Sequence, residues 1–318
     1  MRSVAHHSPG ALPVTPDMVR WAAQAIGAHL VRTPLRRLPL EGRQVYAKLE
    51  NRQQTGSFKV RGALAALVGY REQGLRGPWI TASAGNHGIG LAYAAGLLKA
   101  GPVWVFVPEN TPRAKLHKLR DLGAEVRLCG SGFSEAEQAA RQAAAQLGGV
   151  YVSAYNDPFV VAGQGTIGLE ILEEAPELGM LLAPVGGGGL LSGMALWIRA
   201  HRAETLIWGA QSVCTPGLYN ALYGSHLPER PTLAEGLSGG VEAEAITVRL
   251  LHKLIEGIYL VSEPEIWDSM HWAYHQLGER LEGSAAVALA ALRFRRLPDR
   301  EPIVVVLTGS NTDRLAGL

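Results

Sequence analysis

The sequence has few cysteines and almost no net charge, and both features exclude classes of protein. Only two of the 318 residues are cysteine, Cys129 and Cys214, and their wide spacing is not that of a metal-ligand pair. So few cysteines indicate a reducing compartment rather than a disulfide framework. Lysine and arginine exceed aspartate and glutamate by 30 − 28 = 2. This excess is too small for the basic surface that nucleic-acid binding needs, so we expect no nucleic-acid partner.

Targeting and membrane signals are also lacking. Residues 1–10 contain no apolar core of the signal-peptide type, so we expect a cytoplasmic protein. The uncharged stretch 178–198 is long enough to span a bilayer. However, Pro184 and four consecutive glycines would leave backbone polar groups unpaired in lipid. The stretch therefore predicts a strand, a loop and a helix of a folded domain, and no membrane partner.

Length and pattern predict an α/β protein of about two domains. Short β-branched or aromatic runs alternate with stretches of helical composition, which indicates parallel sheets covered by helices. We expect a small domain over residues 75–155 and a large domain over 1–74 and 156–318, packed around one cleft. Capping boxes are predicted at Ser134 with Glu137 and at Ser262 with Glu265. The predicted strands are 45–49, 79–81, 103–107, 126–129, 150–153, 181–185, 206–210, 258–261 and 303–307.

Glycine is abundant, with 38 residues against a usual share of about 7%. Four of them, Gly186, Gly187, Gly188 and Gly189, lie between a predicted buried strand and a helix. Glycines allow close backbone approach, and their N–H groups can form a nest for a phosphate. The alternative is a structural turn, but ordering four glycines costs too much conformational entropy for an ordinary connection. We therefore predict a phosphate site here.

A lysine at the start of a predicted helix is a candidate nucleophile. Lys59 follows the turn Thr55-Gly56-Ser57-Phe58. The positive end of the helix dipole and local desolvation can lower the pKa of such an amine. A solvated surface lysine is the alternative interpretation.

Two polar segments follow predicted strands. Ser83-Ala84-Gly85-Asn86-His87-Gly88 offers backbone N–H groups, a hydroxyl and an amide at a sheet edge, where a carboxylate can bind. Thr308-Gly309-Ser310-Asn311 offers a hydroxyl to a ligand heteroatom. Each segment could instead be an ordinary capped turn. Together with Lys59 and the glycines, they suit a ligand with a phosphate, an aldehyde and a ring, as in pyridoxal 5'-phosphate.

With these segments in order, the sequence resembles the fold type II pyridoxal-phosphate enzymes, in the branch of threonine and serine dehydratases and serine racemases. The resemblance extends from Arg32 to Asn311. It implies a two-lobed α/β fold like that of tryptophan synthase β, with the cofactor between the lobes. The motifs are S-F-K-V-R-G-A, S-A-G-N-H-G, N-D-P, A-G-Q-G-T, P-V-G-G-G-G-L, E-G-S-A-A and L-T-G-S-N.

The resemblance also implies roles for individual residues. Lys59 would bind the cofactor covalently and remove the substrate Cα proton, and Phe58 would pack beside the ring. Asn86 would bond the phenolic oxygen, and Thr308 would face the pyridine nitrogen, with Glu282 also near the ring. The phosphate would lie on Gly186, Gly187, Gly188 and Gly189. The substrate carboxylate would lie on Ser83, Ala84, Gly85, Asn86 and His87.

The implied activity is loss of the β-hydroxyl from L-threonine, L-serine or a related amino acid, giving a 2-oxo acid and ammonia. Ala84 stands where racemases carry a serine, which argues against racemisation. His87 argues against β-replacement, because relatives with that activity read N-T-G there. A protein that binds the cofactor without catalysis is a further alternative, which an intact Lys59 disfavours.

Several departures from the family bear on metal and substrate. Residues 211–217 contain no carboxylate where many relatives bind a divalent cation, so we expect no metal site there. The segments Glu282-Gly283-Ser284-Ala285-Ala286 and 308–311 differ from the usual motifs, which leaves an unusual β-substituted substrate open. The family suggests a homodimer. The sequence ends soon after the last motif, so we expect no regulatory domain and a catabolic or specialised role.

Overall fold

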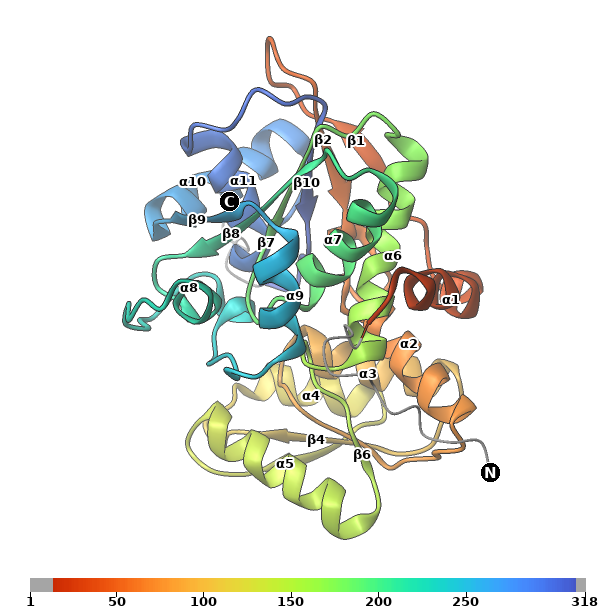
Figure 1. Ribbon diagram of the computed structural model, residues 1–318. Helices are drawn as coiled ribbons and strands as arrows, with labels where there is room; N and C mark the ends of the chain where they lie inside the picture. The colour runs from red at the N-terminus through yellow and green to blue at the C-terminus, as the bar shows by residue number, and fades with distance from the viewer. Residues whose placement is uncertain (1–13, 313–318) are drawn as a thin grey trace.

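Residues 14–312 form two β-sheets, each covered by helices (Figure 1). The structure is a computed structural model, and it describes residues 14–312. The N-terminal segment without a signal-peptide pattern therefore lies outside the described residues. Every strand pair is parallel except β1 with β2, which confirms the α/β prediction.

The larger sheet has six strands in the order β1-β2-β10-β7-β8-β9. Its strands are β1 (Leu35–Arg37), β2 (Val45–Leu49), β7 (Met180–Pro184), β8 (Leu206–Ser212), β9 (Gly257–Val261) and β10 (Ile303–Leu307). All five residues of β10 are apolar and buried, the pattern of a central parallel strand covered on both faces. Helices α10 and α11 cover one face of this sheet, and α6 and α7 cover the other.

The smaller sheet has four strands in the order β5-β4-β3-β6. They are β3 (Trp79–Ala82), β4 (Val103–Val107), β5 (Glu125–Leu128) and β6 (Val150–Tyr151). Helix α5 packs against β3 and β4, and Figure 1 shows this layer at the opposite end of the molecule from α10 and α11. All four strands fall within the predicted small domain, whose boundaries at residues 75 and 155 stay a prediction.

The helices connect and cover these strands. They are α1 (Pro16–Ile26), α2 (Lys59–Glu72), α3 (Asn86–Leu97), α4 (Arg113–Asp121), α5 (Phe133–Leu147), α6 (Pro158–Glu174), α7 (Gly189–His201), α8 (Gly217–Tyr223), α9 (Ile246–Leu254), α10 (Glu263–Trp272) and α11 (Gly283–Phe294). Short 3-10 helices are η1 (Gly27–His29), η2 (Glu50–Arg52) and η3 (Glu235–Leu237), and a π-helical turn, η4 (Ala273–Leu277), continues α10. No helix among residues 14–312 is both long and apolar enough to cross a membrane.

One of the two predicted capping boxes is present. Ser262 and Glu265 form it at the start of α10, as expected. The prediction for Ser134 with Glu137 is wrong, because α5 begins one residue before Ser134 and has Gly132 at its N-cap. The Glu137 side chain instead accepts a hydrogen bond of 2.8 Å from the Tyr151 hydroxyl.

Other predicted boundaries shift slightly. Strand β6 ends at Tyr151 rather than at residue 153, and the loop after β3 ends at Gly85 because α3 already begins at Asn86. Cys129, expected within a buried strand, lies just after β5 and is half-buried.

Glycines allow α6 and α7 to pack with their backbones in contact. A Cβ atom on Gly165 would lie 2.8 Å from Gly193 O, and one on Gly193 would overlap Val161 O. Because backbone atoms cannot move aside without shifting a whole helix, these positions require glycine.

We therefore expect Gly193→Ala to lower the free energy of unfolding by about 1–3 kcal/mol, the usual cost of overpacking a core. Gly96→Ala in α3 is the matched control, since a Cβ there meets nothing within 4 Å. Alanine is also the better helix former, so this control should not lose stability. Urea unfolding of both variants measures the difference, and equal stabilities would contradict the packing argument.

Candidate active site

Lys59 is the first residue of α2, and the turn before it is tied to the end of β10. Phe58 N donates a hydrogen bond of 3.1 Å to Thr308 O. Gly56 has φ +73°, and a Cβ there would lie 2.8 Å from the side-chain oxygen of Asn311. The predicted lysine segment and the predicted threonine segment therefore lie side by side, although 249 positions separate Lys59 and Thr308 (308 − 59).

The Lys59 amine points into the protein rather than into solvent. Its Nζ donates to Ala154 O at 3.0 Å and lies 5.2 Å from the centre of the Phe58 ring. Burial lowers the pKa of Lys59 to about 8, against the opposing attraction of Glu282. A solvated surface lysine, the alternative weighed from sequence, does not fit this environment.

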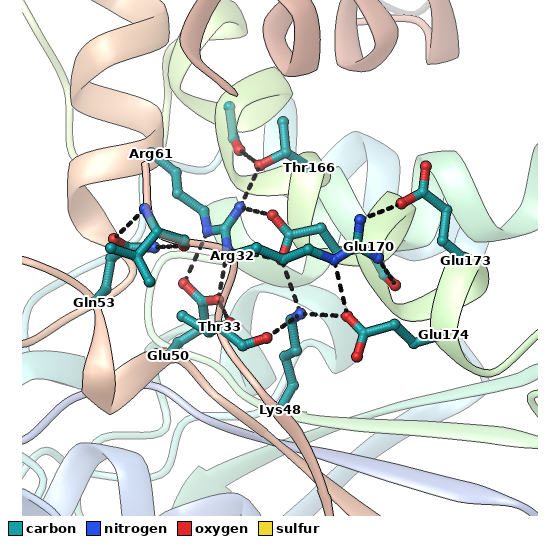
Figure 2. Close-up of polar contacts among 12 residues, drawn as sticks. Arg32, Thr33, Lys48, Glu50, Gln53, Arg61, Thr166, Glu170, Glu173 and Glu174 are labelled. Carbon is teal, nitrogen blue, oxygen red and sulfur yellow. Dashed lines mark hydrogen bonds and ion pairs between the residues drawn. The ribbon is translucent and has the colours of Figure 1, made fainter. Parts of the chain in front are cut away.

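The other side of α2 is held by a buried ion-pair network (Figure 2). Arg61 is fully buried, and its guanidinium makes two hydrogen bonds of 2.8 Å to Glu50. It also bonds Glu170 at 2.6 and 3.0 Å and Thr166 at 3.1 Å. All five donors of the guanidinium are therefore used.

Lys48 completes the network from strand β2. Its Nζ lies 2.8 Å from Glu170 and 3.2 Å from Glu174, and it donates to Thr33 O at 2.7 Å. The Thr33 hydroxyl donates in turn to Glu50. Two cations and two carboxylates, Arg61 and Lys48 with Glu50 and Glu170, are thus paired in the interior, so no charge is left uncompensated there.

The loop after β3 brings the predicted carboxylate-binding residues to the start of α3. Ser83, Ala84, Gly85 and Asn86 are half-buried, and the Ser83 hydroxyl accepts a hydrogen bond of 3.3 Å from Gly85 N. A Cβ on Gly88 would overlap Ser83 O, so the tight turn needs glycine. The first N–H groups of α3 have no acceptor within the helix and are available to an anion.

His87 lies differently from the other residues of this loop. Its side chain is buried, and Nε2 lies 3.0 Å from Val152 O, which makes Nε2 the protonated nitrogen. Burial and the nearby Lys59 charge lower the pKa of His87 to about 3, so the ring is neutral. Its Nε2 thus anchors α3 to the segment after β6, whereas the buried Nδ1 has no hydrogen-bond partner among the described residues.

Asn86 is at the centre of a chain of side-chain hydrogen bonds. Its Nδ2 donates to Glu282 Oε1 at 2.7 Å, and its Oδ1 accepts from Asn311 Nδ2 at 2.7 Å. Asn311 Oδ1 accepts in turn from Lys118 Nζ at 2.7 Å. One N–H of Asn86 is left for a ligand.

Glu282 carries a proton more readily than an ordinary glutamate. Burial raises its pKa to about 7, although the hydrogen bond from Asn86 and the charges of Lys115, Lys118 and Lys59 act in the opposite direction. Perturbed pKa values of an adjacent acid and amine are typical of a functional site.

The four glycines form a cradle without side chains between β7 and α7. Gly188 has φ +89°, a conformation that glycine adopts without strain. A Cβ on Gly187 would overlap the Tyr155 ring, and the Thr247 hydroxyl donates to Gly187 O at 2.7 Å. Because α7 begins at Gly189, its free N–H groups and positive dipole end lie at this loop.

The structure brings these segments together. Tyr155, which covers the glycines, follows Ala154, whose carbonyl accepts from Lys59. Glu282 N donates to Gly309 O at 3.1 Å, next to Thr308. The candidate residues thus share one site between the two sheets.

Some residues at the site were not found from the sequence. Ala154 and Lys118 come from segments without a distinctive motif, and Lys118 looks like any exposed lysine of a helix. Only the packing of α4 beside the loop after β3 reveals its place.

Comparisons with known proteins agree with this geometry. Residues 26–309 match the model of the family described as pyridoxal-phosphate dependent enzyme. The chain belongs to this family, and its cofactor is pyridoxal 5'-phosphate.

Individual relatives cover most of the chain. An L-threonine ammonia-lyase of Geobacter sulfurreducens is 41% identical over 86% of this chain and 68% of its own length. A β-hydroxyaspartate dehydratase of Paracoccus denitrificans is 34% identical over 95% and 97%. The solved structure of maize serine racemase is similar with a TM-score of 0.88 and 27% identity, over 95% of this chain and 94% of that one. The fold is therefore that of fold type II pyridoxal-phosphate enzymes.

The residues present fit the cofactor. A Cβ on Gly187 would overlap the Tyr155 ring, and one on Gly189 would lie 3.0 Å from Tyr155 Cα, so this loop carries no side chains and its N–H groups suit a phosphate. The Lys59 amine, with its lowered pKa, suits an aldehyde. Both are features of the chain itself.

The raised pKa of Glu282 predicts a pH-dependent stability for the cofactor-free protein. The folded state retains the proton between the ordinary value of 4.5 and about 7, whereas the unfolded state loses it. Stability from this group therefore falls as pH rises through that window, on the order of 1–3 kcal/mol.

Denaturant unfolding between pH 4.5 and 8 measures this effect. In Glu282→Gln, the free energy of unfolding should no longer show the decrease with rising pH that Glu282 causes. Glu244→Gln, a change at an exposed position, should show the same decrease as the wild type. A decline of the same size in both variants would show that Glu282 is not its source.

Proposed function

We propose that the protein, an ammonia-lyase of the pyridoxal-phosphate family, removes the β-hydroxyl and the amino group from L-threonine, L-serine or a related β-hydroxy amino acid. The products are a 2-oxo acid and ammonia. The observation that carries this proposal is the Lys59 amine, with a pKa of about 8, which donates to Ala154 O beside the Tyr155 ring that packs on the glycines. The relatives named L-threonine ammonia-lyase and β-hydroxyaspartate dehydratase support the same reaction class.

The chain offers a contact for each part of the cofactor. We assign the phosphate to residues 186–189 and the ring to the space beside Phe58, Thr308, Asn86 and Glu282. When bound, pyridoxal phosphate supplies an aldehyde that links to amino groups and a conjugated ring that accepts the electron pair left at the substrate Cα. In support, Phe58 and Thr308 are joined through their backbones, and Asn86 and Glu282 through their side chains.

Lys59 has the properties of the base that takes the Cα proton. An amine with a pKa of about 8 is partly neutral near pH 7, and general-base efficiency is greatest when the pKa is close to the working pH. Its hydrogen bond to Ala154 O orients the nitrogen lone pair without supplying a competing charge.

The loop after β3 has the properties of a carboxylate site. The Ser83 hydroxyl, the spare N–H of Asn86 and the N-terminal N–H groups of α3 are donors at one place. His87 contributes its backbone N–H, because its ring is buried and bonded to Val152 O.

The overall reaction balances without an oxidant. The Cα proton and the β-hydroxyl leave as water, and one water then hydrolyses the remaining imine. The net products are one 2-oxo acid and one ammonium ion for each amino acid.

Replacement of the lysine tests this function. Lys59→Ala should lower 2-oxo acid release from L-threonine or L-serine by about a thousandfold, the range of a lost general base. Borohydride reduction should fix the cofactor covalently to the wild type and not to Lys59→Ala. Lys253→Ala, at an exposed position in α9, should behave as wild type in both assays. Full activity of Lys59→Ala would contradict the proposal. So would the absence of 2-oxo acid release when the cofactor-loaded wild type is offered each β-hydroxy amino acid.

Racemisation is the second candidate function, because maize serine racemase shares the fold. Ala84 argues against it, since a methyl group cannot carry a proton to the opposite face of Cα.

We expect the wild type to form little D-serine relative to pyruvate, and Ala84→Ser to raise this ratio. The new hydroxyl can exchange a proton with Cα, and alanine and serine are close in size. Chiral chromatography of the residual serine gives the ratio. D-serine at the rate of pyruvate from the wild type would make racemisation a native activity.

We further propose a cytoplasmic homodimer with the small domain at residues 75–155. Two free cysteines support a reducing compartment. Exposed apolar side chains, among them Trp267 and Phe294, support association.

A further inference from the structure

Helix α4 places positive charge beside the candidate active site. A Cβ on Gly88, in the first turn of α3, would lie 3.3 Å from Leu119 Cδ2, so α4 packs directly against the substrate loop. The basic residues of this helix are Arg113, Lys115, His117, Lys118 and Arg120, and its one acid is Asp121. The exposed side of α4 therefore offers cations next to Asn86.

Lys118 is the cation with a direct link to the substrate loop. Its Nζ donates to Asn311 Oδ1 at 2.7 Å, and Asn311 Nδ2 donates to Asn86 Oδ1 at 2.7 Å. The ammonium is thus two hydrogen bonds away from the amide that we assign to the substrate.

Lys118 differs from its neighbour in how its charge is compensated. Lys115 forms an ion pair of 3.1 Å with Glu235. Among residues 14–312, Lys118 takes part in no ion pair, and its partner Asn311 is a neutral amide. An amide oxygen is a weaker partner for an ammonium than a carboxylate is. Replacement of the Asn311 amide oxygen by an anionic ligand is therefore favourable in free energy.

The site itself explains why such a cation matters. Glu282 already supplies one carboxylate, 2.7 Å from Asn86. A substrate with an anionic side chain would meet repulsion from it, and a nearby ammonium offsets that repulsion. L-threonine and L-serine are zwitterions without net charge, and they gain nothing from Lys118.

We propose that Lys118 selects β-hydroxy amino acids that carry a second carboxylate, of which 3-hydroxyaspartate is the smallest. The inference rests on the proposed ammonia-lyase function and names its substrate class. The side-chain carboxylate takes the place of Asn311 Oδ1 as the acceptor of the Lys118 ammonium.

Steady-state kinetics of the cofactor-loaded enzyme tests this specificity. The wild type should have a higher kcat/KM for L-threo-3-hydroxyaspartate than for L-threonine. Lys118→Gln should lower kcat/KM for 3-hydroxyaspartate about tenfold, mainly through KM, as expected for one lost charge-assisted hydrogen bond. Its kcat/KM for L-threonine should fall much less, because L-threonine has no second carboxylate that Lys118 could hold. Lys118→Arg should restore the preference, and Lys253→Gln is the control for loss of an exposed lysine.

A binding measurement gives a second readout that needs no turnover. L-aspartate has the two carboxylates but no β-hydroxyl to lose. L-2-aminobutyrate has only the α-carboxylate and also lacks the β-hydroxyl. L-aspartate should compete with substrate and raise the melting temperature of the wild type, and Lys118→Gln should weaken its binding about tenfold. Binding of L-2-aminobutyrate should weaken much less than that of L-aspartate.

The outcomes separate the two proposals. Turnover of L-threonine with no effect of Lys118→Gln on 3-hydroxyaspartate overturns the role of Lys118 and leaves the ammonia-lyase function standing. If no β-hydroxy amino acid is turned over, the ammonia-lyase function is overturned. The role of Lys118 is then decided by L-aspartate binding, and equal affinities of the wild type and Lys118→Gln would overturn that role.

Discussion

The buried guanidinium of Arg61 is the constraint on which the active site depends. A charge in the interior is tolerated only when it is fully paired, and Glu50 and Glu170 supply that pairing from η2 and α6. Arg61 follows Lys59 by two residues, so the two side chains leave opposite sides of α2. The network, drawn in Figure 2, therefore fixes the start of the helix from behind. The Lys59 amine leaves the opposite side of that helix and donates to Ala154 O.

With Lys59 fixed, the electrostatics of the site follow from burial. Desolvation lowers the pKa of the amine to about 8 and raises that of Glu282 to about 7, so both groups titrate close to neutrality. An acid and a base with such close pKa values can exchange protons with a ligand at little cost. The neutral ring of His87 adds no charge that would disturb this balance.

The central strands could be predicted from the sequence, because their signals are local. The apolar run of β10 and the capping box of Ser262 each depend on a few neighbouring residues. The capping box predicted at Ser134 is wrong because α5 already begins at Phe133, with Gly132 at its N-cap. The hydrogen bonds of the His87 ring with Val152 O and of Lys118 with Asn311 join segments that are distant in the sequence. A local sequence pattern contains no information about such contacts.

The hydrogen-bond chain from Glu282 to Lys118 connects proton affinity with substrate recognition. Lys118 lowers the pKa of Glu282 from a distance, with Asn86 and Asn311 between them. An anion that neutralises Lys118 would remove this effect and favour the protonated carboxyl of Glu282. A dicarboxylic substrate would therefore reduce the negative charge of the site that it enters, whereas L-threonine would leave Glu282 unchanged. The exposed ammonium group of Lys118 thus both selects the charged substrate and changes the pKa of Glu282.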